Sequence, residues 1–128
     1  MLHRPVVFVG DRPNPRKNLD VNVPFVGTKS YKTLLEWIYR LDLDFQSSSM
    51  TNAFDVAGAP RSFDVYENAE VKFIALGEEA AERLATLGIK HFKLPHPSPR
   101  NKLLNDKAEI SRLLYRCKKF IYKGSSRA

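Results

Sequence analysis

A strand–helix–strand pattern runs from residue 71 to residue 94, where the sequence reads VKFIALGEEAAERLATLGIKHFKL. The apolar runs Val71–Leu76 and Ile89–Leu94 each predict a buried strand. Between them, the acidic pair Glu78 and Glu79 suits the first turn of a helix, and Gly88 suits its end. Two strands joined by a helix in this way usually lie parallel in one sheet.

The same alternation extends to both sides of this segment. Val6–Val9 predicts a buried strand, Ser30 can cap a helix that reaches Leu41, and Ser49–Phe54 predicts a weaker strand. The apolar spacing in the last quarter predicts a helix from about Asp106 to Tyr122. We therefore expect an α/β fold, a three-layer α/β/α sandwich around a central four-stranded, mostly parallel sheet.

Composition limits the class of protein. The 128 residues are enough for one domain, so we expect residues 1–128 to form a single unit with a frayed tail over residues 124–128. No apolar run approaches the roughly 18 to 20 residues that a membrane span needs. The one cysteine, Cys117, excludes a disulfide or an all-cysteine metal site within the chain and favours an intracellular setting. Cys117 falls on the apolar face of the last predicted helix and is expected to lie in the core, and Trp37 is expected to be a packing residue.

Positive charge is concentrated at one end of the sequence. Residues 1–89 contain 10 Lys or Arg and 12 Asp or Glu, whereas residues 90–128 contain 11 Lys or Arg and only 2 Asp or Glu. Such an asymmetry predicts a polyanionic partner and favours nucleic acid, although a solvated basic helix that only keeps the protein soluble would give the same count.

A proline-rich heptapeptide, residues 95–101 with the sequence PHPSPRN, begins the basic region. Its three prolines exclude helix interior and central strand, so we expect a stiff loop that carries His96, Ser98 and Arg100 at nearly fixed separations. In a parallel sheet, ligands bind beyond the carboxyl ends of the strands. Three segments should meet there: Gly10–Asn14, Met50–Phe54 and the heptapeptide.

These segments, in order, resemble the motifs of the uracil-DNA glycosylase superfamily. Residues 9–14 (VGDRPN) are similar to its first motif, residues 24–27 (PFVG) to the same stretch of its iron–sulfur branch, Thr51-Asn52 to its second-strand motif, and residues 95–101 to its His-Pro-Ser motif. The resemblance spans roughly residues 5–122, and the His-Pro-Ser-Pro segment is its most specific part.

The resemblance implies roles for eight residues. Asp11 and His96 would be catalytic: Asp11 would orient water or stabilise an oxocarbenium ion, and His96 would stabilise negative charge on the leaving base. Phe25 would stack on the flipped base and Asn52 would hydrogen-bond to its edge. The residues that would contact DNA are Ser98, Arg100, Asn101 and Lys102. No metal or other cofactor is implied, because the cluster cysteines are absent.

The chain also departs from the superfamily pattern. Arg12 stands where glycosylases place the catalytic Asp or Asn, Asn14 replaces a glycine, and Arg100 replaces an apolar wedge. An alternative function is therefore a weak or inactive member of the fold that binds DNA, senses bases or has a structural role. A small nucleotide-processing enzyme that uses Asp11 with a metal ion is a third possibility.

Each of the main site residues also has a purely structural interpretation. Asp11 can be a turn former, Asn52 can cap the loop after its strand, and Phe25 can anchor a loop. His96 can belong to an idle connector. The sequence leaves open which base is recognised, whether the DNA is single- or double-stranded, and the oligomeric state.

Overall fold

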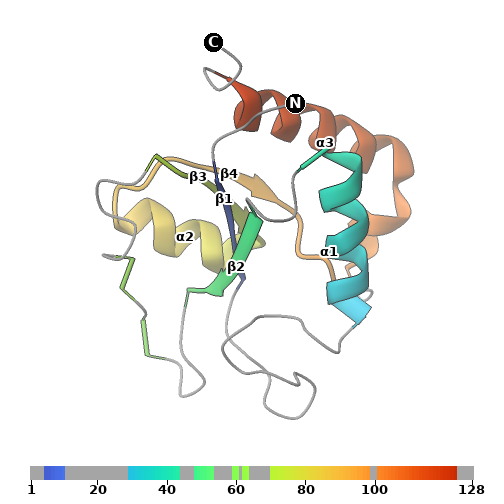
Figure 1. The fold of residues 1–128 in the computed structure, drawn as a ribbon. Helices are drawn as coiled ribbons and strands as arrows, with labels where there is room; N and C mark the ends of the chain where they lie inside the picture. Colours follow the sequence, from blue (N-terminus) through green and yellow to red (C-terminus); the bar gives the residue numbers. More distant parts are fainter. Residues whose placement is uncertain are drawn as a thin grey trace.

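The structure is a computed structural model that describes residues 5–10, 29–43, 48–53, 59–60, 62–63, 70–98 and 101–123 (Figure 1). Strands and helices alternate along most of the chain. In order, the elements are β1 (Val6–Gly10), α1 (Lys29–Arg40), β2 (Ser48–Asn52), β3 (Lys72–Leu76), α2 (Glu78–Thr86), β4 (His91–Leu94), the 3-10 helix η3 (Lys102–Asn105) and α3 (Lys107–Tyr122).

The four strands form one parallel sheet in the order β2-β1-β3-β4. In its register, Gly10 at the end of β1 lies opposite Asn52 at the end of β2, and Leu76 at the end of β3 lies opposite Leu94 at the end of β4. The prediction of an α/β fold with a four-stranded parallel sheet is confirmed.

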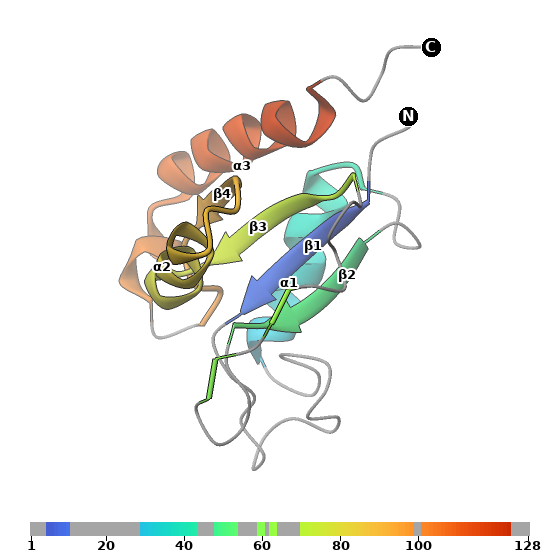
Figure 2. The ribbon, with the colours of Figure 1, turned by 90° about the vertical axis from the view of Figure 1, so that its left-hand side faces the viewer.

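Helices cover both faces of the sheet (Figure 2). On one face, α1 and α3 pack against alternate strand residues. That core consists of Val6, Phe8, Leu34, Trp37, Ile38, Leu41, Ile74, Leu76, Leu94, Ile110, Leu114, Cys117 and Ile121. On the other face lies α2, and the core there consists of Val7, Val9, Ala53, Phe63, Phe73, Ala75, Ala80 and Leu84. The alternation of the strand residues between the two cores follows from the two-residue period of a β-strand.

Local sequence signals account for most element ends. The Asp106 carboxylate accepts a hydrogen bond from the Glu109 N–H at 3.0 Å and so caps α3. Gly88 follows α2 with a φ of +71°, the left-handed conformation that favours glycine. The expectation that Ser30 caps α1 is wrong, because α1 begins at Lys29 and the Ser30 side chain is buried within its first turn.

Trp37 and Cys117 are core residues, as predicted. The Trp37 side chain is 3% exposed and the Cys117 side chain is fully buried. Burial raises the pKa of the Cys117 thiol to about 12, so the thiol is protonated at neutral pH. The predicted strand residue Phe54 and the predicted tail, residues 124–128, lie outside the described residues.

Among the helices described, none is long and apolar enough to cross a membrane.

Candidate functional site

The carboxyl edge of the sheet carries two of the predicted site residues, Asn52 and His96. The chain leaves β1 toward β2 and leaves β3 toward β4, so the direction of winding reverses between β1 and β3. Such a reversal is where open α/β sheets bind ligands, because the two diverging connections leave a crevice. Asn52 ends β2 on one side of this point, and His96 follows β4 on the other.

Asn52 carries an unusual buried amide. The residue is 1% exposed, and its backbone lies opposite Gly10 in the sheet. Neither its Oδ1 nor its Nδ2 finds a hydrogen-bond partner among the residues that the structure describes. A buried amide without a partner costs roughly 1–3 kcal/mol. The Asn52 side chain thus presents an acceptor oxygen and a donor NH2 group at the carboxyl edge, beside the end of β1.

His96 lies against the start of α2. Gly77, the N-cap residue of α2, has a φ of +99°, and a Cβ built on it would come within 3.3 Å of the His96 Cβ and 3.5 Å of Cδ2. Only glycine readily adopts this backbone conformation. Gly77 therefore gives the imidazole room to approach the end of β3, which is one strand closer to Asn52 than β4 is.

The protonation state of His96 follows from its contacts. The Ser98 N–H donates to the His96 Nδ1 at 3.1 Å, so Nδ1 is an acceptor and the ring proton of the neutral imidazole is on Nε2. Burial lowers the pKa of His96 below its ordinary value of 6.5, and the nearby Glu79 carboxylate opposes this shift. The imidazole is therefore neutral at neutral pH, with Nε2–H as its donor.

Asn101 closes the loop that holds His96. Its Nδ2 donates to the His96 carbonyl at 3.0 Å, and its Oδ1 accepts from the Leu103 N–H at 3.1 Å. Its own N–H donates to the Ser98 carbonyl at 2.9 Å. The Asn101 side chain thus caps η3 and also holds the loop that carries His96. This positioning role was not predicted, because the sequence analysis did not predict η3, the helix that Asn101 caps. The predicted DNA contact by Asn101 stays a prediction.

The remaining predicted site residues fall in different places. Lys102 is exposed in the first turn of η3, on the stretch of chain between the His96 loop and α3. Asp11, Phe25 and Arg100 lie outside the described residues, so their predicted roles have no structural counterpart here.

The spacing between Asn52 and the residue against which His96 packs follows from the strand order. His96 contacts the residue after β3, which is two strands away from β2. Neighbouring strands are about 4.8 Å apart, so the backbone of Gly77, against which His96 packs, is roughly 10 Å from the backbone of Asn52 across the sheet. The arrangement offers an amide on one side and an imidazole N–H on the other.

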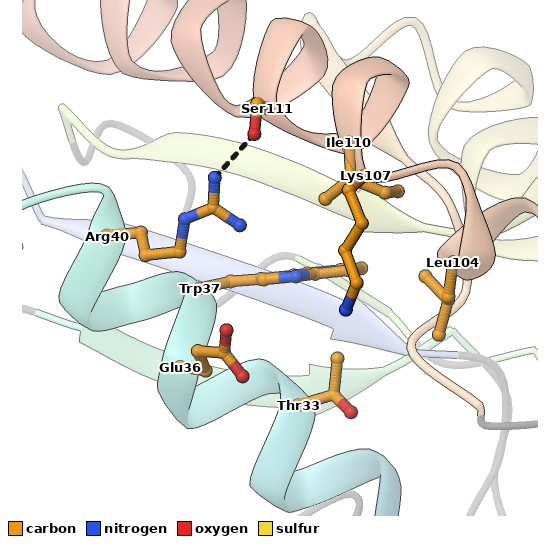
Figure 3. A pocket seen from close by; sticks show the side chains of 8 residues that line it. All are labelled: Thr33, Glu36, Trp37, Arg40, Leu104, Lys107, Ile110 and Ser111. Carbon is orange, nitrogen blue, oxygen red and sulfur yellow. Dashed lines mark hydrogen bonds between the residues drawn. The ribbon is translucent and has the colours of Figure 1, made fainter.

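A second concave feature lies between α1 and α3 (Figure 3). It is a groove of about 360 Å³ with the Trp37 ring at its floor. Arg40 reaches across it, and its Nη2 donates to the Ser111 Oγ at 2.8 Å. The other lining residues are Thr33, Glu36, Leu104, Lys107 and Ile110. The sequence analysis missed this groove, because it depends on how two helices distant in sequence pack.

No group of three or more His, Cys, Asp or Glu side chains suited to a metal ion occurs within the described ranges.

Comparison with known proteins does not assign the chain to a family. No known family model matches the chain, and no curated protein is significantly similar to it in sequence.

Proposed function

We propose that the chain is a DNA glycosylase-like protein that binds DNA, flips a base out of the strand, and hydrolyses the N-glycosidic bond of uracil or a related modified pyrimidine. The observation that carries this proposal is the buried Asn52 amide, which has no hydrogen-bond partner among the described residues. Buried polar groups are almost always hydrogen-bonded. An exception at the ligand-binding edge of an α/β sheet favours a group whose partner is a ligand.

The chemistry of the Asn52 amide fits a pyrimidine edge. With Oδ1 accepting from N3–H and Nδ2 donating to O4, one side chain satisfies both groups of uracil. In that orientation cytosine is mismatched, because it presents an acceptor at N3 and a donor at N4. A flipped base would thus be read by hydrogen bonds along one edge.

His96 supplies the complementary group for bond cleavage. As the bond between the sugar C1′ and the base N1 breaks, its electron pair leaves with the base, and negative charge develops on O2. The neutral His96 Nε2–H is a donor suited to stabilise that charge. Water adds its oxygen to C1′ and its proton ends on the base, so the products are an abasic site and the free base. Asp11 remains our prediction for the residue that orients this water.

A gel assay tests the proposal. The protein is incubated with an oligonucleotide that contains one uracil, in single- and double-stranded form, and abasic sites are then cleaved with alkali. We expect strand cleavage only at the uracil. His96→Ala should lower the rate about 100- to 1000-fold, the usual effect of losing one oxyanion donor. Asp11→Ala should also lower the rate. His91→Ala is the matched control, because that imidazole bonds to the Ile89 carbonyl and lies outside the site.

Arg12 gives the second candidate function a basis of its own, because it stands where glycosylases carry the catalytic acid. A protein that binds uracil-containing DNA and leaves it intact would be a base sensor. Uncleaved uracil substrates at high protein concentration, together with an unaffected Asp11→Ala variant, would contradict the hydrolytic proposal.

A further inference from the structure

The helices described on the two faces of the sheet carry opposite net charge. The helix on one face, α2, contains three glutamates and one arginine. The helices on the other face, α1 and α3, together contain eight lysines or arginines and two glutamates. The sheet separates these helices (Figure 2), so among the described helices the basic pair lies on one side and the acidic one on the other. A polyanion will approach the molecule on the α1 and α3 side.

Within the basic side, α3 presents an ordered row of side chains. Arg112, Tyr115, Arg116 and Lys119 recur at intervals of three and four residues and are all exposed. They lie on the side of α3 opposite its buried residues, which include Ile110, Leu114, Cys117 and Ile121. We call this row the α3 stripe. It is about 10 Å long, on the order of three nucleotides of a DNA strand.

An aromatic ring sits within this row of cations. Tyr115 is 62% exposed, and the Lys119 ammonium lies 4.6 Å from the centroid of its ring. Ser111, one helical turn before Tyr115, borders the groove between α1 and α3, where Lys107 and Arg40 add two cations and Glu36 one carboxylate (Figure 3). The groove therefore adjoins the stripe along α3. Arg112 is paired with Glu109, so Arg116 and Lys119 carry most of the stripe's charge.

We infer that the α3 stripe binds a single strand of nucleic acid, with phosphates on Arg116 and Lys119 and an unpaired base stacked on Tyr115. Basic side chains interleaved with an aromatic ring are the combination that holds single strands without regard to sequence. Each base stacked on an aromatic side chain contributes on the order of 1–3 kcal/mol.

The stripe suits nucleic acid better than two other polyanions. Tyr115 is the one large exposed hydrophobic residue described on α3, so the helix lacks the apolar face that an anionic membrane surface requires. A protein interface would need a cluster of apolar side chains at its centre. In the α3 stripe, the cations of Arg116 and Lys119 suit the phosphates of a nucleic acid strand, and the Tyr115 ring suits one of its bases.

This surface is separate from the carboxyl-edge site, and the inference does not depend on hydrolysis. The two share only the class of partner. Figure 2 shows that α3 starts near the carboxyl ends of the strands and runs back toward their other ends. A strand whose base occupies the edge site can therefore continue along α3.

Fluorescence anisotropy with a labelled oligodeoxycytidine of about twelve nucleotides, whose base edge mismatches the Asn52 amide, tests the phosphate contacts. Binding is measured between about 50 and 200 mM salt, where the slope of log affinity against log salt counts the neutralised phosphates. Arg116→Gln/Lys119→Gln should reduce the slope by about 1.4, the value for two contacts on a single strand. The control, Lys90→Gln/Lys93→Gln, removes the same charge outside the stripe and should leave the slope unchanged. Equal losses in both double variants would overturn the inference.

The same assay tests the stacking contact. Tyr115→Ala should weaken binding roughly 5- to 100-fold, and Tyr115→Phe should retain it, because stacking needs the ring and not the hydroxyl. Tyr39→Ala, at a tyrosine that is 83% exposed on α1 and does not line the groove, should have no effect. Polyglutamate or anionic vesicles that bind as tightly as the oligonucleotide would assign the stripe to another partner. Asn52→Leu should leave this binding unchanged, which separates the stripe from the proposed function.

Discussion

Gly77 is the residue on which the placement of His96 depends most directly. Gly77→Ala would put a methyl group 3.3 Å from the His96 Cβ, at a φ that side-chain-bearing residues rarely adopt. We expect a loss of roughly 1–3 kcal/mol in the free energy of unfolding and displacement of the imidazole. Thermal unfolding and the chemical shifts of the His96 ring protons measure the two effects.

Gly88→Ala is the control for this substitution. Gly88 also has a positive φ, +71°, but a Cβ there meets nothing within 4 Å. It should lose a comparable amount of stability, about 1–2 kcal/mol, with no change at His96. Unchanged His96 signals in Gly77→Ala would contradict the close packing.

Asn52 yields a prediction in which stability and function change in opposite directions. Asn52→Leu replaces the buried amide with an apolar group of similar size. If no protein group satisfies the amide, the free energy of unfolding should rise by roughly 1–3 kcal/mol while recognition of uracil is lost. Chemical denaturation and the uracil cleavage assay measure the two quantities. A clear destabilisation would show that the amide is bonded within the chain.

His96 gives the folded state a predictable pH dependence. Its pKa is lowered by burial, so the unfolded state takes up a proton on this ring at a higher pH than the folded state does. The free energy of unfolding should therefore decline as pH falls below about 6.5, the ordinary pKa of histidine. His96→Gln should remove this part of the decline. Melting temperatures of the two proteins between about pH 5 and 8 test it, and parallel curves would refute it.

At the scale of elements, the packing of α1 against α3 depends on Trp37. This ring forms the floor of the groove and is 3% exposed. Trp37→Ala should lower the free energy of unfolding by about 3–5 kcal/mol, because it leaves a cavity between two helices and the sheet. Tyr39→Ala, two residues away on the same helix and 83% exposed, should change it by less than about 0.5 kcal/mol. Chemical denaturation of both variants is the measurement, and similar losses would contradict this account.

Most elements were predictable from local pattern. The runs over β1 and β3 are apolar and partly β-branched, which is typical of strands buried on both faces, and all five residues of β1 are buried. The end of α2 at Gly88 and the cap of α3 at Asp106 follow from single residues. The short η3 was missed, because four residues after a proline-rich loop show no period.

The candidate site was predictable in outline only. The residues that end parallel strands share one edge, so the proximity of Asn52 and the His96 loop followed from topology. The approach of His96 to Gly77 could not be read from the sequence, because it joins residues from two different connections. The hydrogen bonds of the Asn101 amide to His96 and Leu103 could not be read from the sequence either.

On the scale of the whole molecule, the edge and the two faces of the sheet carry residues of different chemistry. Its carboxyl edge carries Asn52 and His96, one face carries the acidic α2, and the other carries the basic α1 and α3. We propose that the edge reads a base while the basic face holds the strand that carries it. This division predicts that binding strength depends on salt, whereas the preference for uracil does not.

The side-chain amide of Asn52 gives the most direct test of this account. Its ¹H–¹⁵N signals, assigned by their loss in Asn52→Leu, are followed by NMR during titration with single strands that differ only in one uracil or one cytosine. We predict that the uracil strand moves these signals and that the cytosine strand leaves them largely in place. Signals that stay fixed with both strands while DNA binds elsewhere would contradict the account.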